Sequence, residues 1–344
     1  MRKAIFELKD TKKAAPLFEG LHDSLIQTCL EGLMGGKIYV TDTEAPRSAL
    51  AFVAEFAYFA GEPDRELAAF KPQGYAGMVP PDDRWAQLIE EYWPDADKTT
   101  RYALKKDGWF DRKKLESFIA AIPDGYELKR IDGDVFDMLI KDEDFDDSVS
   151  HFESKEQYLD MGRGFVIMKD GEIVSAASSY TVYSKGLDIQ IDTAEAERRK
   201  GLATATGAAL ILSCLEDGLA PRWDAANTDS LHLAEKLGFE FSHEYHCYWV
   251  DAIFDRVIKD PDRSLWDSFC GRYEMENESR KVFEILLKDG DLYCAFSGKN
   301  GDPLELKLFP VGENEFGFLW ADDVMVFKDG AMIVNNIKCN RTED

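Results

Sequence analysis

The chain of 344 residues carries 41 Lys and Arg against 66 Asp and Glu, a net charge of −25, and 45% of its residues are hydrophobic. This length allows two or three domains, and the apolar share is enough for large cores, so disorder is not expected. The negative charge disfavours nucleic acid and anionic membranes as partners, because both need a basic surface. It is compatible with a cationic substrate, although an acidic surface more often only keeps a protein in solution.

The N-terminus and the cysteines both indicate a cytoplasmic protein. Residues 1–10 hold too many charges for a signal peptide. The sequence contains no run of about 18 apolar residues, so no membrane span is predicted. The six cysteines are scattered and form no Cys-x-x-Cys pair. Neither a structural zinc site nor a disulfide framework is therefore expected, and a reducing compartment fits this pattern.

Residues 1–130 form the first predicted segment, an α/β region without a catalytic motif of its own. Helices are predicted at residues 17–33, 85–92 and 112–121, and a short strand is predicted at residues 37–42. The apolar run 48–59 has the length of a strand or of a buried helix, and its periodicity does not decide between them. Residues 72–81 are rich in Pro and Gly, which predicts a loop.

Residues 131–255 form the second predicted segment. Asp170-Gly171 between two apolar runs is a strong short-turn signal, so we expect a hairpin at 165–177. Strands and helices then alternate, with predicted bounds of 186–193, 202–216, 222–226, 228–237 and 239–250. Asn227 or Thr228 is expected to cap the helix that begins at this point, because short polar side chains accept from free N–H groups there.

Residues 262–344 form the third predicted segment, an antiparallel β-domain of six to eight strands. Its signals are turn dipeptides between alternating apolar stretches, at Asp289-Gly290, Asn300-Gly301 and Asp329-Gly330. Around residues 266–273 and 304–309 it faintly resembles the small lipocalin-like β-domains appended to some serine hydrolases. This resemblance implies no activity, but it leaves open that the function lies in the β-domain.

A basic, glycine-bearing turn joins the predicted strand 186–193 to the helix 202–216. The turn reads Arg198-Arg-Lys-Gly-Leu-Ala-Thr204. The first N–H groups of a helix have no internal partner and lie at the positive end of its dipole, so they bind anions. Gly201 lets the backbone approach a ligand closely. The turn therefore predicts a phosphate site.

Two blocks of the second segment carry a family resemblance. The turn matches the pattern Arg/Gln-x-x-Gly-x-Gly/Ala in full, and Asn227 with residues 234–239 matches a second helix and its Gly-Phe ending. Together they resemble the GNAT superfamily of acetyl-CoA-dependent N-acyltransferases. The longer run 223–239 is similar to one bacterial branch, which includes the enzyme for self-resistance to the aminopolyol antibiotic zwittermicin A. The resemblance covers residues 15–250 and implies a GNAT-type mixed α/β sheet flanked by helices.

The resemblance implies how acetyl-CoA, as co-substrate, would be held. Its pyrophosphate would lie on backbone N–H groups of the turn, and its pantetheine arm would run along strand 189–193 as an added strand. Asn227 would contact the far end of the arm, and N–H groups near Ile191 would hold the developing oxyanion. The cofactor-binding residues expected are Ile191, Thr193, Arg198, Arg199, Lys200, Gly201, Leu202, Ala203, Thr204 and Asn227.

The catalytic residues are less evident, because this chain departs from the family pattern. Many relatives have a tyrosine, the acid for the leaving thiolate, where this chain has Ala234. Tyr245 or Tyr248 on the final strand is the expected substitute, and Asp188 is the expected base. His243 and His246 lie on opposite faces of a strand, so no metal is expected.

The predicted function is an N-acetyltransferase that moves acetyl from acetyl-CoA to a primary amine of a small cationic molecule, such as an amino-antibiotic. The alternative is a CoA-binding sensor or scaffold whose catalysis has decayed, as Ala234 suggests. The expected partner is the small-molecule amine, with no nucleic acid and no membrane, and the chain is compatible with a homodimer.

Overall fold

The computed structural model describes residues 4–21, 23–72, 74–106, 109–276, 281–297, 303–319, 324–334 and 336–342. The chain divides into two compact units, residues 1–250 and 251–344. Within the described ranges no helix is long and apolar enough to cross a bilayer. All six cysteines carry free thiols.

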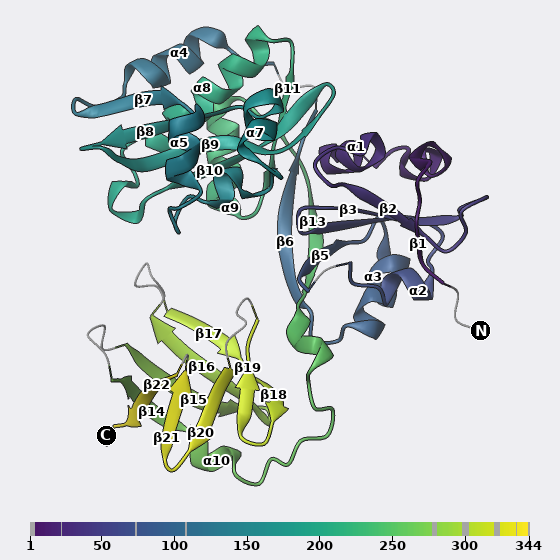
Figure 1. The fold of residues 1–344 in the computed structure, drawn as a ribbon, viewed down its shortest axis with the longest axis vertical. Helices are drawn as coiled ribbons and strands as arrows, with labels where there is room; N and C mark the ends of the chain where they lie inside the picture. Colours follow the sequence, from purple (N-terminus) through teal and green to yellow (C-terminus); the bar gives the residue numbers. More distant parts are fainter. Residues whose placement is uncertain are drawn as a thin grey trace. The chain divides into compact units, whose positions relative to one another are not determined.

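The first unit contains an eight-stranded sheet in the order β1-β2-β3-β4-β5-β13-β6-β12. Its strands are β1 (Phe6–Glu7), β2 (Lys37–Val40), β3 (Ser48–Val53), β4 (Phe56–Gly61), β5 (Ala76–Val79), β6 (Asp97–Leu104), β12 (Asp224–Ala225) and β13 (Phe241–Val250). The last strand of the predicted second segment, β13, thus pairs with two strands of the first segment, β5 and β6. The long strands β6 and β13 run side by side (Figure 1).

The apolar run 48–59 forms a hairpin, β3 and β4, rather than a buried helix. All six residues of β3 and five of the six in β4 are buried. A strand covered on both faces is apolar throughout, which removes the alternation that would have identified it. The turn at Ala54 and Glu55 places Ala54 in the left-handed region, at φ 51°.

The loop predicted at residues 72–81 is wrong in part, because it contains the buried strand β5. This strand pairs in parallel with β4 and antiparallel with β13. A Cβ on Gly77 would lie 2.7 Å from the ring of Trp249 and 2.8 Å from Sγ of Cys247. Close packing of these side chains requires glycine in mid-strand, and that glycine conceals the strand in the sequence.

The second sheet of this unit has five strands in the order β11-β10-β9-β8-β7. They are β7 (Tyr126–Arg130), β8 (Gly164–Lys169), β9 (Glu172–Tyr183), β10 (Gly186–Thr193) and β11 (Ala220–Arg222). The predicted hairpin at Asp170-Gly171 is confirmed, with φ of 52° and 90° at the two turn residues. The strand predicted at 222–226 is divided between β11 and β12, which belong to different sheets.

Helices cover both faces of the five-stranded sheet. One face packs on α8 (Leu202–Glu216), which contacts α4 (Arg112–Ala120) and α9 (Thr228–Leu237), and the other packs on α1 (Ser24–Glu31) and α6 (Asp147–Ser150). The side chain of Ile191 lies against Gly207 of α8. Side chains alternate along a strand, so Asp188, three residues earlier on β10, faces α1. The remaining helices of the unit are α2 (Arg65–Ala68), α3 (Asp83–Tyr92), α5 (Gly133–Leu139) and α7 (Lys155–Met161).

The two sheets part between β10 and β12. Strand β10 pairs with β11 only at residues 186–188. After Trp223 the chain continues as β12, which pairs with β6 instead. In the described part of the chain, no strand therefore pairs with the outer edge of residues 189–193. We call the point where the pairing ends, between Asp188 and Asp224, the fork.

The second unit is a nine-stranded antiparallel sheet in the order β17-β16-β15-β14-β22-β21-β20-β19-β18. The nine strands exceed the six to eight predicted, and the end strands β17 and β18 follow each other in the chain, so the sheet curves into a near-barrel. Turns at Asp289-Gly290 and Asp329-Gly330 have positive φ, as predicted; Asn300-Gly301 lies outside the described residues. The elements are α10 (Trp266–Phe269), β14 (Gly271–Met275), β15 (Val282–Lys288), β16 (Asp291–Ser297), β17 (Pro303–Lys307), β18 (Phe309–Gly312), β19 (Glu315–Gly317), β20 (Val324–Lys328), β21 (Ala331–Val334) and β22 (Ile337–Arg341).

Candidate active site

The basic turn between β10 and α8 has the backbone of an anion site. Gly201 is the N-cap of α8 at φ 83°, and no side chain caps the helix there. Arg199 is also left-handed, at φ 61°. The first helical N–H groups, from Leu202 to Thr204, therefore remain for a ligand. A Cβ on Gly201 would find no atom within 4 Å, so the space beside the turn is open.

The charged side chains of this turn divide into two groups. The ammonium of Lys200 lies 2.7 Å from the Glu197 carboxylate, which also binds Lys169 at 2.9 Å and accepts from Tyr126. Hydrogen bonds from Lys200, Tyr126 and Lys169 lower the pKa of Glu197 to about 2. Lys200 thus anchors the turn through its side chain and would offer a ligand its backbone N–H; Arg198, Arg199 and Lys200 are all exposed.

Two further cations lie near the start of α8. The Arg198 guanidinium donates to the Thr193 carbonyl at 3.3 Å. The Lys236 ammonium, from α9, donates to the Thr204 hydroxyl at 3.2 Å. Lys236 was not among the residues predicted from the sequence, because only the packing of α9 against α8 brings it there.

The outer edge of β10 offers main-chain groups to a ligand. The Ala194 N–H donates to the Val174 carbonyl of β9 at 3.0 Å. Because the direction of these groups alternates along an antiparallel strand, the N–H and C=O groups of Ile189, Ile191 and Thr193 point away from β9. These groups lie on the edge of β10 that no strand pairs with in the described structure, and they include those of Ile191 and Thr193, the two residues predicted to contact pantetheine.

Asn227 and Ala234 lie on the helix that follows β12. The predicted cap is confirmed at Asn227, whose side chain accepts from the Ser230 N–H at 2.9 Å. The cap uses the amide oxygen, so the amide NH₂ group takes no part in it. Ala234 is fully buried. At the position where many relatives have a tyrosine, this chain therefore has only a buried methyl group.

Three aspartates and one arginine meet in the interior at the fork. Asp188 lies on β10 and Asp224 on β12, on either side of the gap. The Arg101 guanidinium, on β6, donates to Asp224 at 2.6 Å in a pair that is mostly buried. Asp23, the N-cap of α1, is the third carboxyl group, and the Thr181 hydroxyl donates to Asp188 at 3.3 Å. The cations that act on this cluster are Arg101 and, at Asp23, Lys106. Two cations thus face three carboxyl groups, and at least one carboxyl group is expected to keep its proton.

The pKa values agree with this charge imbalance. Burial, reinforced by the charges of Asp23 and Asp224, raises the pKa of Asp188 to about 8. Burial raises the pKa of Asp224 to about 6, against the opposing effect of Arg101. Burial also raises the pKa of Asp23. Asp188 thus keeps its proton to a higher pH than Asp224 does.

The two candidate tyrosines lie on opposite faces of β13. The Tyr245 hydroxyl is buried beside Asp224 and makes no hydrogen bond of normal geometry within the described residues. Burial, followed by the Asp224 charge, raises the pKa of Tyr245 well above its ordinary value. The Tyr248 hydroxyl instead donates to Glu90 of α3 at 2.7 Å. The structure therefore brings Tyr245 to the fork, and not Tyr248.

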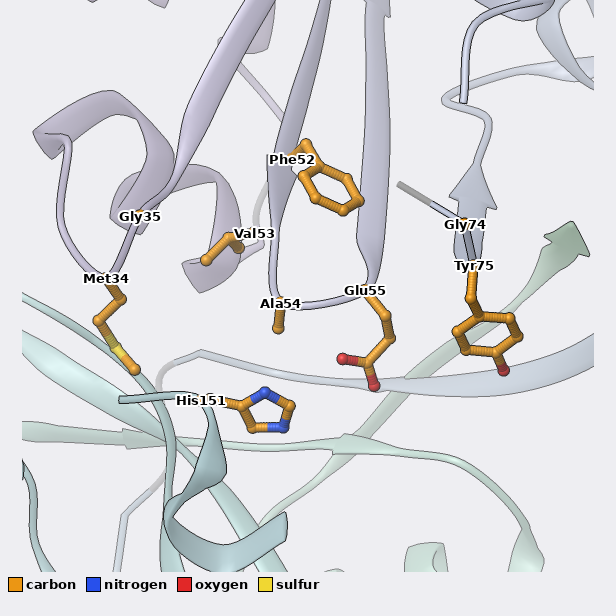
Figure 2. Close-up of a pocket in the computed structure, with 9 residues that line it drawn as sticks. All are labelled: Met34, Gly35, Phe52, Val53, Ala54, Glu55, Gly74, Tyr75 and His151. Atoms are coloured by element: carbon orange, nitrogen blue, oxygen red, sulfur yellow. The ribbon is translucent and has the colours of Figure 1, made fainter. Parts of the chain in front are cut away.

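A cavity of about 430 Å³ lies at the β3–β4 turn (Figure 2). The β3–β4 turn contributes Phe52 and Glu55, and Tyr75 and His151 come from two other segments. The His151 ring lies 4.4 Å from the ring of Tyr180, edge to face. The Tyr180 hydroxyl is buried without a hydrogen bond among the described residues.

Asp188 and Tyr245 apart, the residues of the fork and the cavity were not predicted from the sequence. Arg101 and Asp224 are 123 positions apart in the chain and meet only through the pairing of β6 with β12. Glu55 lies within the apolar run 48–59, which carried no functional signal. Among the described residues, no group of three or more His, Cys, Asp or Glu side chains is arranged to hold a metal ion.

The comparisons with known proteins agree with this arrangement. A family model described as GNAT acetyltransferase matches residues 15–248. The uncharacterized N-acetyltransferase YdfB of Bacillus subtilis is 27% identical over 245 residues, which cover 66% of this chain and 90% of the relative. The crystal structure of a GCN5-related N-acetyltransferase-like protein from Streptococcus suis 89/1591 matches with a TM-score of 0.66 and 41% identity, over 70% of this chain and 98% of that one. The chain is therefore an acyltransferase that belongs to the GNAT acetyltransferase family, whose members use acetyl-CoA.

Proposed function

We propose that the protein transfers acetyl from acetyl-CoA to a primary amine of a small cationic molecule, with Asp188 as the general base. The observation that carries the proposal is the position of this carboxyl group. It is buried at the fork, at the inner end of the same strand that leads to the phosphate turn. The acidic surface of the chain, with its net charge of −25, favours the approach of a cationic acceptor.

The residues fit acetyl-CoA, which would supply the acetyl thioester. The uncapped N–H groups of α8 and the open space beside Gly201 suit a pyrophosphate. Arg198, Arg199 and the backbone of Lys200 would add charge and donors, and Thr204 with Lys236 would extend the site. The outer edge of β10, at Ile191 and Thr193, would hold the pantetheine amides, with Asn227 across the gap.

The chemistry explains why a raised pKa at Asp188 matters. An alkylammonium of pKa about 10.4 is neutral at pH 7 in about one molecule in 2,500, a cost of about 4.6 kcal/mol. Transfer of its proton to an ordinary aspartate of pKa about 3.9 is uphill by about 9 kcal/mol, whereas transfer to a group of pKa about 8 is uphill by about 3 kcal/mol. Buried Asp188 is therefore a far better acceptor for this proton than an exposed aspartate.

We propose amino-antibiotics as the acceptors to test first. The motivating feature is the resemblance of residues 223–239 to the branch that includes the zwittermicin A resistance enzyme. The competing proposal, a CoA-binding sensor without catalysis, is motivated by buried Ala234 in place of the tyrosine acid.

Acetyl-CoA is expected to bind the protein and raise its melting temperature, because a ligand that binds only the folded state stabilises it by mass action. Calorimetry and thermal denaturation check this. A screen of amino-antibiotics, polyamines and amino acids with detection of free thiol then separates the proposals. Binding without turnover of any amine would favour the sensor, and absence of binding would refute both.

Tyr245→Phe is expected to lower kcat by about tenfold or more while the acetyl-CoA affinity stays unchanged. With its raised pKa, this phenol stays protonated, so it would donate a hydrogen bond to the charge that develops at the fork during the reaction. Because the hydroxyl makes no hydrogen bond of normal geometry in the described structure, its removal is expected to change the melting temperature little. Tyr248→Phe is the matched control, and a loss of kcat in this variant instead would reverse the assignment.

A further inference from the structure

We propose that the 430 Å³ cavity is the acceptor site, and that it selects acceptors carrying a second cationic group, which the Glu55 carboxylate binds while the reacting amine reaches the fork. Diamines and their longer or cyclic relatives are the chemical class with this pattern. The inference rests on the proposed function, because it assumes that an amine is acetylated at the fork.

The lining of the cavity fits an organic cation. Glu55 is the one acidic residue among the described lining residues, and neither Lys nor Arg is among them. The rings of Phe52, Tyr75 and His151 belong to the same lining (Figure 2). A carboxylate among aromatic rings is the setting that binds ammonium groups by charge and by cation–π attraction.

The turn that carries Glu55 is held in place. Its backbone carbonyl accepts from the Gly77 N–H at 2.7 Å, which ties the β3–β4 turn to β5. Tyr75 stacks on Trp249 of β13, with ring centroids 5.1 Å apart and nearly parallel planes. The backbone that carries Glu55 and the aromatic wall are thus fixed by hydrogen-bond and ring contacts, and a cation would bind without reordering them.

Tyr180 connects the cavity to the fork. Its ring contacts His151 of the lining, and its hydroxyl lies close enough to Glu55 that this carboxylate, after burial, raises its pKa. Two charges at the fork also act on the pKa of this hydroxyl: Arg101 lowers it and Asp188 raises it. One buried tyrosine therefore lies between the proposed cation site and the proposed base.

Two buried hydroxyl groups in this region have weak partners. Those of Tyr180 and Tyr245 lie near the carboxylates of Glu55 and Asp224 but make no hydrogen bond of normal geometry in the described structure, although buried polar groups rarely remain unsatisfied. A primary amine carries donors, and its neutral form also has a lone pair, so it can satisfy such hydroxyls on its way to Asp188. An acceptor with one amine at the fork and a second at Glu55 fits both features.

The test compares α,ω-diamines of three to eight carbons with monoamines of equal chain length, by release of free thiol from acetyl-CoA. In the unmodified protein at least one diamine is expected to exceed its matched monoamine by about tenfold or more in kcat/KM. In Glu55→Gln this preference is expected to vanish through a rise in KM, with kcat nearly unchanged. Glu62→Gln is the control, because Glu62 is an exposed residue at the far end of β4 that pairs with Arg47.

Calorimetric titration with the preferred diamine keeps the outcomes distinct. Binding that weakens in Glu55→Gln and persists in Glu62→Gln supports the cation site without reference to turnover. Equal kcat/KM for diamines and monoamines, or a Glu55→Gln variant with unchanged KM, would overturn the inference and leave the proposed function standing. If acetyl-CoA itself does not bind, the proposed function fails first.

Discussion

Asp188→Asn is expected to abolish acetyl transfer and at the same time to stabilise the protein. Without the carboxylate no group at the fork takes the proton from the ammonium, so kcat/KM is expected to fall by about 100-fold or more. In the unmodified protein kcat/KM is expected to rise with pH and level off above about 8, where Asp188 is ionised. A profile of kcat/KM against pH checks this. The rise towards pH 8 is expected in the unmodified protein and is expected to be absent from the profile of Asp188→Asn.

The gain in stability follows from the same pKa. Burial raises the pKa of Asp188 to about 8, against an ordinary value of about 3.9. Between these values the unfolded chain releases the proton while the folded protein keeps it, so the stability contributed at low pH is lost as pH rises towards 8. At about 1.4 kcal/mol per pKa unit, the loss is at most about 6 kcal/mol. Asparagine does not ionise, so the variant is expected to melt higher than the unmodified protein, by more at pH 8 than at pH 5.

Asp192→Asn is the matched control for activity. Asp192 lies on the same face of β10, and burial raises its pKa as well, but its carboxylate accepts from Gln190 instead of facing Asp224. It is expected to keep most of the activity. Full activity of Asp188→Asn together with loss of activity in Asp192→Asn would refute the assignment to Asp188 and make Asp192 the general base.

Gly201→Leu is expected to weaken acetyl-CoA binding by about 100-fold or more while the protein still folds. The residue is left-handed, at φ 83°, and a side chain there would project into open space beside the phosphate turn. The folded protein would bear a backbone strain of about 1–2 kcal/mol, and the ligand would meet the new side chain. Calorimetry with acetyl-CoA measures the affinity, and thermal denaturation measures the strain.

Gly218→Leu separates strain from loss of the binding surface. Gly218 follows the other end of α8 at φ 71°, and a Cβ there also finds nothing within 4 Å. Both substitutions therefore carry a similar conformational cost, but only the one at Gly201 lies in the anion site. Equal effects of the two variants on acetyl-CoA affinity would show that the phosphate turn is not where the cofactor binds.

Much of the fold was predictable where its cause is local. The hairpin at Asp170-Gly171 and the cap at Asn227 depend on a few adjacent residues, and the structure confirms both. Strand β5 was missed because Gly77 makes room for Trp249, a contact between segments about 170 residues apart. The run 48–59 is compatible with a strand or a helix by its sequence alone, because strands that are covered on both faces lack the alternation of apolar and polar residues.

The sequence by itself determined the proposed cofactor half of the site. Strand, basic turn and helix are consecutive, so Gly201, the uncapped N–H groups of α8 and the direction of β10 follow from local conformation. Only the tertiary structure decided the proposed acceptor half. Strand pairing brings Arg101 and Asp224 to Asp188, and it turns Tyr245 towards the fork and Tyr248 towards Glu90. The physical reason is that burial and proximity set the pKa of a carboxyl group, and both arise from residues far apart in the chain.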